Sequence, residues 1–491
     1  KIYTQKEIEE GGLKIITTLD LDKQNKAQEI VTKYANINQS TYNASNAALV
    51  SIDPKTGQII TMVGSRDYWD TDNDGNVNVA TSERQPGSSF KPLVYATAFE
   101  DKWFPGSTLY DVKTSFGGTY TPDNYDKSFR GPVTIRYALQ NSLNIPAVKI
   151  LDLVGFEKMI DKAHELGLAS LDDPDRYGLS LVLGGGEVKL VELTGAYGTF
   201  ANGGKRNPTT PILKVTDQNG KVLEEYTEDN RAKNEKVVFK PETAYLISNV
   251  LSDNASRTPT FGSNSDLYIA NHTVAAKSGT TDENRDGWTV GYTPSIVTGV
   301  WAGNNDNSPT SNDGVYIAAP IWNEYMSYLL ENTTNEEFYK PDTIANITVD
   351  RYSNQKPVNG SDTITDLGAP WHQPTEYPKS ITTYRVCKSN GKLADNSIPV
   401  ELTEEKVSRE IHSEKPDDPN YEKPVASWAA GAGLTSSPPT EKCVIEEVKP
   451  SIKITNPTNG GTVDGKLYIS TFINATNGIE KVDYYFDGGL I

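Results

Sequence analysis

Ser88 and Lys91 are the pair of residues in this chain whose types and spacing could carry covalent catalysis. A Pro-Gly turn signal precedes them, and the apolar run 93–100 that follows indicates a helix. Residues three apart on a helix share one face, so Lys91 would lie under Ser88 one turn later. A neutral lysine amine can take the proton of a serine hydroxyl, and the N–H groups at a helix start can hold an oxyanion. The segment therefore offers the parts of an acyl-transfer site.

Alone, this spacing is not specific. Ser389 and Lys392 share it, but the Asn-Gly between them predicts a hairpin turn rather than a helix. An isolated match is more often a helix N-cap followed by a solvated lysine. Other segments of the chain must decide between the two interpretations.

Two further segments fit with the first. Ser142 and Asn144 lie between two helical runs in a stretch closed by Pro146, so a loop there could present a hydroxyl and an amide together. The segment Lys277-Ser278-Gly279-Thr280 ends an apolar run that predicts a strand. Gly279 would leave room for a substrate backbone along that strand, and the hydroxyls beside it could hold a carboxylate.

The elements that must position these residues alternate between strands and helices. The sequence predicts a helical block between an early strand pair and a later group of strands, which is an α+β pattern. The expected strands are 13–19, 47–52, 58–63, 268–276, 288–292 and 296–301, and the expected helices are 21–34, 93–100, 135–140, 147–153, 157–166, 188–201 and 242–251.

Composition narrows the function classes. The 491 residues carry a formal net charge of −18, which argues against binding nucleic acid through a basic patch. No apolar run approaches the ~20 residues that span a bilayer. Cys387 and Cys443 predict either a disulfide in an exported protein or two free thiols, and the histidines and cysteines form no zinc-type cluster. No cofactor is expected. The chain begins at Lys1 rather than Met, so we expect a fragment of a longer protein.

The composition changes after about residue 331, where Pro, Asn, Thr and Ser accumulate in a β-containing region expected to span 331–450. Residues 413–420 resemble a linker. Residues 451–491 alternate like strands at 452–454, 466–469 and 481–485 and predict part of a small β-sandwich.

In order and spacing, the three segments resemble the Ser-x-x-Lys, Ser-x-Asn and Lys-Thr/Ser-Gly set of the penicillin-binding transpeptidases. The stretches 183–203 and 286–303 are similar to those of class A penicillin-binding proteins, and 11–28 resembles the connector that follows their glycosyltransferase domain. Details of the motifs resemble the streptococcal type. The resemblance covers roughly residues 10–330. It implies the fold shared with serine β-lactamases, an antiparallel sheet with helices on both faces plus an all-helical subdomain, over residues 45–330, after a linker arm at 1–44.

The resemblance also implies a role for each site residue. Ser88 would attack the carbonyl between the last two D-alanines of a peptidoglycan stem peptide, with Lys91 as its base and Ser142 as the relay to the leaving D-alanine. Asn144 would hold the substrate amide, and Lys277, Ser278 and Thr280 the terminal carboxylate, beside Gly279. The N–H groups of Ser88 and Thr280 would form the oxyanion hole. A second cation such as Lys277, with desolvation, would lower the pKa of Lys91.

Two closer literal spellings of the motifs are expected to be decoys. Lys55-Thr56-Gly57 precedes Ser88 and falls in a hairpin turn, and Ser252-Asp253-Asn254 follows a helical run too near Lys277. The stretch 70–75 begins like a calcium loop, but Thr81 stands where the twelfth-position Glu belongs, which favours a polar surface loop.

Three functions remain in competition: a D,D-transpeptidase, a related hydrolase (a D,D-carboxypeptidase or β-lactamase), and a β-lactam-binding sensor or scaffold without catalysis. No deacylating Glu can be assigned. The resemblance implies stem peptides ending in D-Ala-D-Ala and β-lactams as ligands. It also implies an upstream glycosyltransferase domain and membrane anchor, location on the outer face of the bacterial cytoplasmic membrane, and cell-wall synthesis or division proteins as partners.

Overall fold

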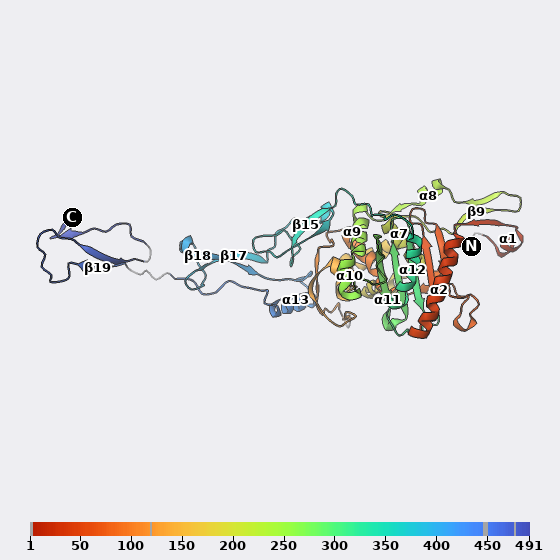
Figure 1. Ribbon diagram of the computed structural model, residues 1–491, viewed down its shortest axis with the longest axis horizontal. Coiled ribbons are helices and arrows are strands. Elements are labelled where there is room, and N and C mark those ends of the chain that lie inside the picture. The colour runs from red at the N-terminus through yellow and green to blue at the C-terminus, as the bar shows by residue number, and fades with distance from the viewer. Residues whose placement is uncertain (1–2, 118–119, 445–449, 476–477) are drawn as a thin grey trace. The chain divides into compact units, whose positions relative to one another are not determined.

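The computed structural model describes residues 3–117, 120–444, 450–475 and 478–491 (Figure 1). The chain forms two compact units, which we describe separately. The first unit holds residues 1–381 and 410–435, and the second holds 382–409 and 436–491. The chain therefore leaves the first unit after residue 381, returns to it at 410, and leaves it again after 435.

The centre of the first unit is a five-stranded antiparallel sheet in the order β12-β13-β14-β2-β3. Both tight connections that the sequence predicts, between β2 and β3 and between β13 and β14, are present. The register places Trp288 opposite Trp301, in the middle of the sheet. The strands are β2 (Asn46–Ile52), β3 (Ile59–Val63), β12 (Ala275–Thr280), β13 (Asp286–Tyr292) and β14 (Val297–Gly303).

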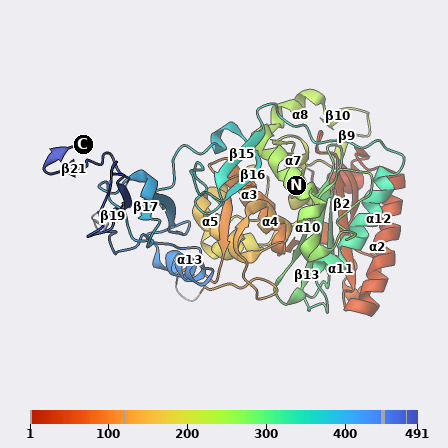
Figure 2. The ribbon, with the colours of Figure 1, turned by 60° about the vertical axis from the view of Figure 1, so that its left-hand side comes forward.

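Alternate residues of the strands face two different cores. Ala47 and Leu49 of β2 join a cluster with α2 (Leu21–Tyr42) and α12 (Ala319–Leu330). Ala48 and Val50 face the opposite way and join the larger cluster. Figures 1 and 2 show α2 and α12 together beside the sheet, with α7 on its other side. Both faces are covered, which explains why β2 is buried at every position.

The helices that pack on the sheet face of Ala48 and Val50 form the helical subdomain. This subdomain carries the first two motifs, Ser88 with Lys91 and Ser142 with Asn144. The antiparallel sheet with helices on both faces and this subdomain agree with the predicted fold. The helices are α3 (Lys91–Phe99), α4 (Ile135–Gln140), α5 (Asn144–Val154), α6 (Phe156–Glu165), α7 (Leu190–Ala201), α9 (Pro241–Ser252) and α10 (Asn254–Phe261); α11 (Gly314–Ile317) precedes α12 on the other side.

Several predicted elements of the first unit have different bounds. The helix expected at 21–34 extends to Tyr42, and the strand expected at 13–19 covers only Lys14–Thr17. The expected strand 268–276 is wrong over most of its length, because Asn271 adopts a left-handed turn conformation and β12 begins only at Ala275. The expected helix 147–153 starts earlier, at Asn144, because Pro146 falls in the first turn, where a helix needs no N–H donor.

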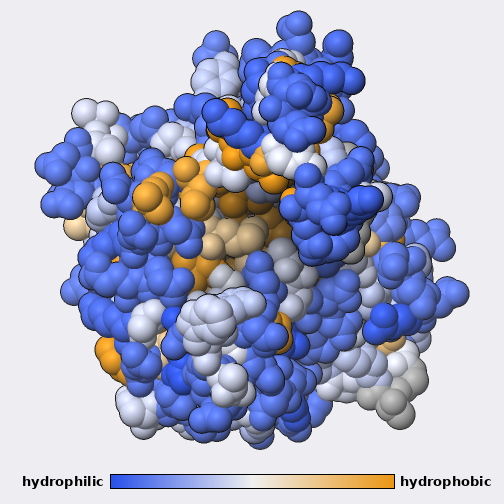
Figure 3. Space-filling model, turned by 90° about the vertical axis from the view of Figure 1, so that its right-hand side faces the viewer, coloured by the Kyte–Doolittle hydropathy of each residue, from blue (hydrophilic) through white to orange (hydrophobic). Residues whose placement is uncertain are grey.

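The N-terminal arm carries exposed apolar side chains. Its strand β1 (Lys14–Thr17) pairs with β9 (Ile212–Thr216), and Ile15 and Ile16 are 48% and 44% exposed. Figure 3, viewed from the side of this arm, shows hydrophobic side chains gathered in a hollow. Within the described residues, no helix combines the length and apolar character needed to cross a membrane.

The late segments of the first unit pack onto the helical subdomain. Strand β16 (Thr363–Gly368), which pairs with β15 (Ala345–Asp350), supplies Asp366, and both of its carboxylate oxygens accept hydrogen bonds from Arg136. Residues 413–420, which the sequence likened to a linker, instead bury Glu414 in an ion pair with Lys149 of α5 and then begin α13 (Pro419–Gly431). Glu414 and Lys415 of that stretch therefore form ion pairs within the first unit, with Lys149 and Asp152.

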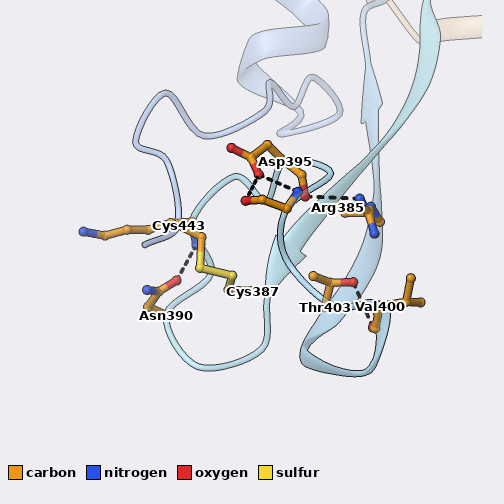
Figure 4. The surroundings of a disulfide bond; sticks show 9 residues. Arg385, Cys387, Asn390, Asp395, Val400, Thr403 and Cys443 are labelled. Carbon is orange, nitrogen blue, oxygen red and sulfur yellow. Dashed lines mark hydrogen bonds between the residues drawn. A yellow bond between two sulfur atoms is a disulfide. The ribbon is translucent and has the colours of Figure 1, made fainter. Parts of the chain in front are cut away.

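The second unit is built from short strand pairs. A disulfide joins Cys387 to Cys443 (Figure 4), which selects one of the two predicted alternatives. The expected strand 466–469 is wrong, since β20 begins at Ser470 and pairs with β19. The described strands are β17 (Ile381–Cys387), which starts at the boundary residue, β18 (Thr403–Arg409), β19 (Ser451–Asn456), β20 (Ser470–Asn474), β21 (Tyr485–Phe486) and β22 (Gly489–Leu490).

Candidate active site

Ser88 lies in a single 3₁₀ turn, η3 (Gly87–Phe90), that runs directly into α3. A 3₁₀ helix has three residues per turn, so Ser88 and Lys91 stand almost above one another, as the spacing predicts. Ser88 is half-buried, and among the described residues no hydrogen bond holds its side chain. Its hydroxyl is thus open to a ligand, and such contacts often tighten only when substrate is bound.

Lys91 is the first residue of α3 and is 0% exposed. Its amine donates to the Ser142 carbonyl oxygen at 2.6 Å, to Asn144 Oδ1 at 2.8 Å and to Ser142 Oγ at 3.5 Å. All three acceptors are neutral oxygens. Burial, with the positive charge of Lys277 second, lowers the pKa of Lys91 well below its ordinary value. The arrangement favours a neutral amine, which is the form that a general base needs.

Ser142 and Asn144 occupy the junction of α4 and α5. Ser142 has a positive φ of 56°, a left-handed conformation that is uncommon for residues other than glycine and costs of the order of 1 kcal/mol or more. Asn144 is the first residue of α5, and its Nδ2 donates to the Asp123 carbonyl oxygen at 2.9 Å. Ser142 is therefore on a loop as predicted, whereas Asn144 belongs to the helix.

Lys277 lies within β12, and its side chain joins the same cluster. The Lys277 amine donates to Ser142 Oγ at 2.9 Å and to the Ser278 carbonyl oxygen at 2.9 Å. Burial first, and the charge of Arg257 second, lower the pKa of Lys277 to about 7. Ser142 Oγ thus lies between two lysine amines, at a position where a proton could be passed.

Close backbone packing holds the serine turn against β12. A Cβ on Gly279 would lie 2.3 Å from the Pro86 carbonyl oxygen, and one on Gly87 would lie 2.4 Å from that of Thr280. Gly87 also has a positive φ of 55°. Glycine is needed at both positions because no side chain fits. This packing brings Ser88 beside Thr280, whose Oγ1 accepts from the Gly314 N–H at 2.9 Å.

The structure therefore brings Ser88, Lys91, Ser142, Asn144 and the strand Lys277–Thr280 into one cluster, although they come from three distant parts of the chain. The predicted roles of these residues stay predictions. Among the described residues, no carboxylate forms an ion pair with Lys91 or Lys277. The site is a cluster in which serine hydroxyl, lysine amine and asparagine amide groups converge.

Sequence reasoning missed two residues that support the cluster. Arg257 of α10 is 1% exposed, donates to the carbonyl oxygens of Leu251 and Leu267, and contributes to the low pKa of Lys277. Asn124 accepts hydrogen bonds from the first N–H groups of α5. Neither residue belongs to a recognisable motif, and each acts across a distance in sequence that a local pattern does not report.

The three look-alike segments lie elsewhere. Lys55-Thr56-Gly57 is in the turn between β2 and β3, with Gly57 at a φ of 79°. Ser252 ends α9, and the Asp253 side chain caps α10. The Ser389–Lys392 segment turns back after β17, where Gly391 has a φ of 69°.

Comparison with known proteins agrees with this geometry. The family described as penicillin-binding protein transpeptidase domain matches residues 47–327. The chain belongs to this family. The matching relatives are of class A, and a bacterial Ig domain family matches residues 450–491.

Two relatives illustrate the extent of the likeness. Penicillin-binding protein 1A of Aquifex aeolicus is 38% identical over 307 residues, which cover 60% of this chain and 39% of that protein. Penicillin-binding protein 1A of Clostridium botulinum (strain Langeland) is 31% identical over 423 residues, covering 81% of this chain and 50% of that protein. This chain spans about half the length of such relatives, or less.

A solved structure extends the comparison to the fold. The PonA1 protein of Mycobacterium tuberculosis, in complex with penicillin V, superposes with a TM-score of 0.59 at 26% identity. The match covers 69% of this chain and 91% of that one. The penicillin-binding protein transpeptidase fold, with a β-rich C-terminal region, is therefore the fold of this chain.

Proposed function

We propose that this chain is a D,D-transpeptidase that cross-links peptidoglycan stem peptides ending in D-Ala-D-Ala through an acyl ester on Ser88. The observation that carries the proposal is the fully buried Lys91 amine, one turn from Ser88 and surrounded by neutral acceptors. A lysine whose pKa is lowered in this way can act as a base near neutral pH.

In the acylation step, Ser88 Oγ attacks the carbonyl carbon of the penultimate D-alanine while Lys91 takes the hydroxyl proton. The N–H groups of Ser88 and Thr280 stabilise the oxyanion. The C–N bond then breaks, and Ser142 passes a proton from Lys91 to the leaving amine. The 3.5 Å and 2.9 Å distances from Ser142 Oγ to the two lysine amines support this relay.

In the second step, an amine of a neighbouring stem peptide attacks the ester carbonyl. The bond between the acyl carbon and Ser88 Oγ breaks as the new amide forms, and the proton of the attacking amine passes through Lys91 to the leaving Ser88 Oγ. Lys277, Ser278 and Thr280 bind the terminal carboxylate of the donor, beside Gly279, and Asn144 binds its amide. Among the described residues, neither Arg257 nor the protonated form of Lys277 has an ion-pair partner, which supports an anionic ligand.

The proposal extends to the whole protein. Residues 45–330 form the transpeptidase domain, after a linker arm at 1–44 and before the β-containing region 331–450 and the partial β-sandwich 451–491. A glycosyltransferase domain and a membrane anchor precede the linker, and the enzyme works on the outer face of the membrane beside other cell-wall synthesis or division proteins. The streptococcal type rests on details of the three motifs alone.

Labelling with a fluorescent penicillin tests the proposal. A β-lactam should acylate Ser88 and remain, because no carboxylate hydrogen-bonds Lys91 or Ser142 to serve as a deacylating base among the described residues. The wild type and a Ser252→Ala control should be labelled, whereas Ser88→Ala should not, and Ser142→Ala should be labelled much more slowly. An unlabelled wild type would contradict the proposal.

Product analysis separates the transpeptidase from the related hydrolases. With a donor peptide ending in D-Ala-D-Ala and an amine acceptor, we expect release of D-alanine with cross-linked product. Release of D-alanine with hydrolysed donor alone would indicate a carboxypeptidase. Rapid, complete turnover of penicillin would indicate a β-lactamase. Penicillin binding without reaction on any peptide would indicate a sensor.

A further inference from the structure

Asn124 lies on the connection between β5 (Thr108–Asp111) and β6 (Gly131–Thr134), next to the start of α5. It is 2% exposed, and its side chain uses its full hydrogen-bonding capacity. Its Oδ1 accepts from the N–H groups of Asn144 at 2.8 Å and Ile145 at 3.3 Å. Its Nδ2 donates to Asp111 Oδ1 at 2.7 Å and to the Ser128 carbonyl oxygen at 2.8 Å.

The start of α5 depends on this contact because the helix does not cap itself. The first N–H groups of a helix have no partner within it. Leu143 stands at the N-cap position and offers no side-chain acceptor, and Pro146 has no N–H. A side chain twenty positions earlier in the chain therefore satisfies the two N–H groups that remain in this turn.

The contact also reaches the reacting groups. Asn144, the residue that Asn124 holds by its backbone, accepts from the Lys91 amine through its own side chain. The neighbouring Asp123 carbonyl oxygen accepts from Asn144 Nδ2 and so fixes the orientation of that amide. Both the backbone and the side chain of Asn144 are thus set by two consecutive residues of one loop.

Asp111 fixes the position of the loop between β5 and β6 by accepting a hydrogen bond from Asn124. It is 0% exposed, and besides Asn124 its carboxylate accepts from the Arg130 N–H at 3.0 Å and faces the Arg130 guanidinium at 3.6 Å. Asp111 ends β5, so the sheet pair β5–β6 carries the anchor. The order of contacts is Asp111, Asn124, Asn144 and Lys91.

We propose that Asn124 is a positioning residue, which transmits the placement of Asp111 to Asn144 and thereby sets the geometry of the Lys91 amine. It touches neither substrate nor the reacting atoms. The inference rests on the proposed acylation of Ser88, and it goes beyond the three motifs because no motif contains this residue.

The Asn124→Asp variant tests the proposal by turning the donor that faces Asp111 into an acceptor. We expect the second-order rate constant for acylation by a fluorescent penicillin to fall about 10–100-fold, since small displacements of reacting groups carry losses of this size. The additional Asp111→Asn exchange restores a donor–acceptor contact between positions 111 and 124 and leaves a carboxylate at the start of α5, where it is favourable, although the Ser128 carbonyl oxygen still lacks its donor. This double variant should therefore recover part of the lost rate.

The pH dependence separates positioning from loss of structure. In the Asn124→Asp variant two carboxyl groups face each other, and one of them must hold a proton for the contact to form. Among the described residues, Asp126 and the Arg130 guanidinium are charged groups next to this pair, and the Tyr95 hydroxyl of α3 is a titratable group that interacts with Asp111. The acylation rate relative to wild type should therefore rise as the pH falls. The Asn124→Ala variant, which adds no charge, should be slow with a constant ratio, and it replaces the Asp variant if that one does not fold.

The matched control is Asn207→Asp. Asn207 is 6% exposed, and its side-chain amide likewise donates two hydrogen bonds, here to the carbonyl oxygens of Pro54 and Lys55 in the β2–β3 turn. The acylation rate of the Asn207→Asp variant should equal that of wild type. The inference is overturned if folded Asn124→Asp and Asn124→Ala acylate at the wild-type rate, if the control is equally slow, or if the double exchange recovers nothing. The proposed function is tested separately, and it fails if wild type is unlabelled, if it turns penicillin over rapidly, or if product analysis with a donor peptide and an amine acceptor shows no cross-linked product.

Discussion

Two lysines of the first unit are equally buried and yet differ in chemistry. Lys91 and Lys149 are both 0% exposed. The Lys149 amine faces the Glu414 carboxylate at 2.8 Å, and the Glu414 side chain is itself 2% exposed. In the part of the chain that the structure describes, the Lys91 amine donates only to neutral oxygens, and the nearby charge is that of a second lysine, Lys277. Burial alone therefore does not turn a lysine into a base. A buried lysine without a carboxylate partner, such as Lys91, is shifted toward its neutral form. A buried lysine with such a partner, such as Lys149, forms a structural ion pair.

The largest expected effect is the loss of acylation when Lys91 is changed to Met. Removal of the base should lower the acylation rate constant by about 10²–10⁴-fold. Thermal unfolding should show no loss of stability, because the variant no longer buries an uncompensated amine. Stopped-flow labelling with a fluorescent penicillin and calorimetry measure the two quantities. A clearly destabilised variant would show that Lys91 is a structural residue like Lys149.

The Lys149→Met variant should have the opposite profile. It leaves the Glu414 carboxylate buried without its partner, which should cost about 3–5 kcal/mol of unfolding free energy. The acylation rate per folded molecule should change little. The Lys149→Met/Glu414→Leu double variant should recover most of the stability, as urea unfolding would show. If Glu414→Leu alone were neutral, the pair would not be the structural tie that we describe.

The Asn144→Asp variant converts the environment of Lys91 into that of Lys149. A carboxylate 2.8 Å from the amine would favour its charged form and raise its pKa. Acylation at neutral pH should fall about 10–100-fold, and the pH–rate profile should move to higher pH. Asn144→Ala provides the control, because it also loses the amide but should not move the profile. A profile that stays in place in both variants would argue against Lys91 as the base.

The last prediction, similar in size to that for Asn144→Asp, concerns the pH dependence of stability. Lys277 has a pKa of about 7 in the folded state, against about 10.4 in an unfolded chain. Between these values the unfolded chain holds a proton that the folded chain lacks, so raising the pH stabilises the folded state. From pH ~7 to ~9, wild type should gain on the order of 2–3 kcal/mol relative to Lys277→Met, with no change below pH ~6. Urea unfolding at several pH values measures this, and a constant difference would contradict it.

The sequence predicted the parts of the molecule whose signals are local. The apolar runs of β2, β3, β13 and β14 and the turns between them gave the sheet, and three short motifs gave the candidate site. It did not predict Glu414, because an acidic residue in a Pro- and Asp-rich stretch normally indicates solvation. Only the fold shows that Glu414 forms an ion pair with Lys149, 265 positions away in the sequence.

Two other features were not predicted for the same reason, namely that their signals are not local. The apolar run before Lys277 resembled a strand, but Asn271 turns the chain and delays β12 to Ala275. Asn124 lacks any local signature of capping, because the helix that it caps begins twenty residues later. The boundaries at residues 44 and 330 stay predictions. Contacts between side chains that are far apart in the sequence are therefore what the sequence alone does not predict.

The disulfide has a mechanical consequence that follows from chain connectivity. Cys387 follows the first departure of the chain from the first unit, and Cys443 follows the second, so the bond spans the returning segment 410–435. The bond therefore gives a tensile load applied at residue 491 a covalent path from Cys443 to Cys387 and on to Ile381 that does not run through α13 or the Lys149–Glu414 pair. Reduction would remove this path, and the returning segment 410–435 would then be part of the only covalent route between residue 491 and Ile381.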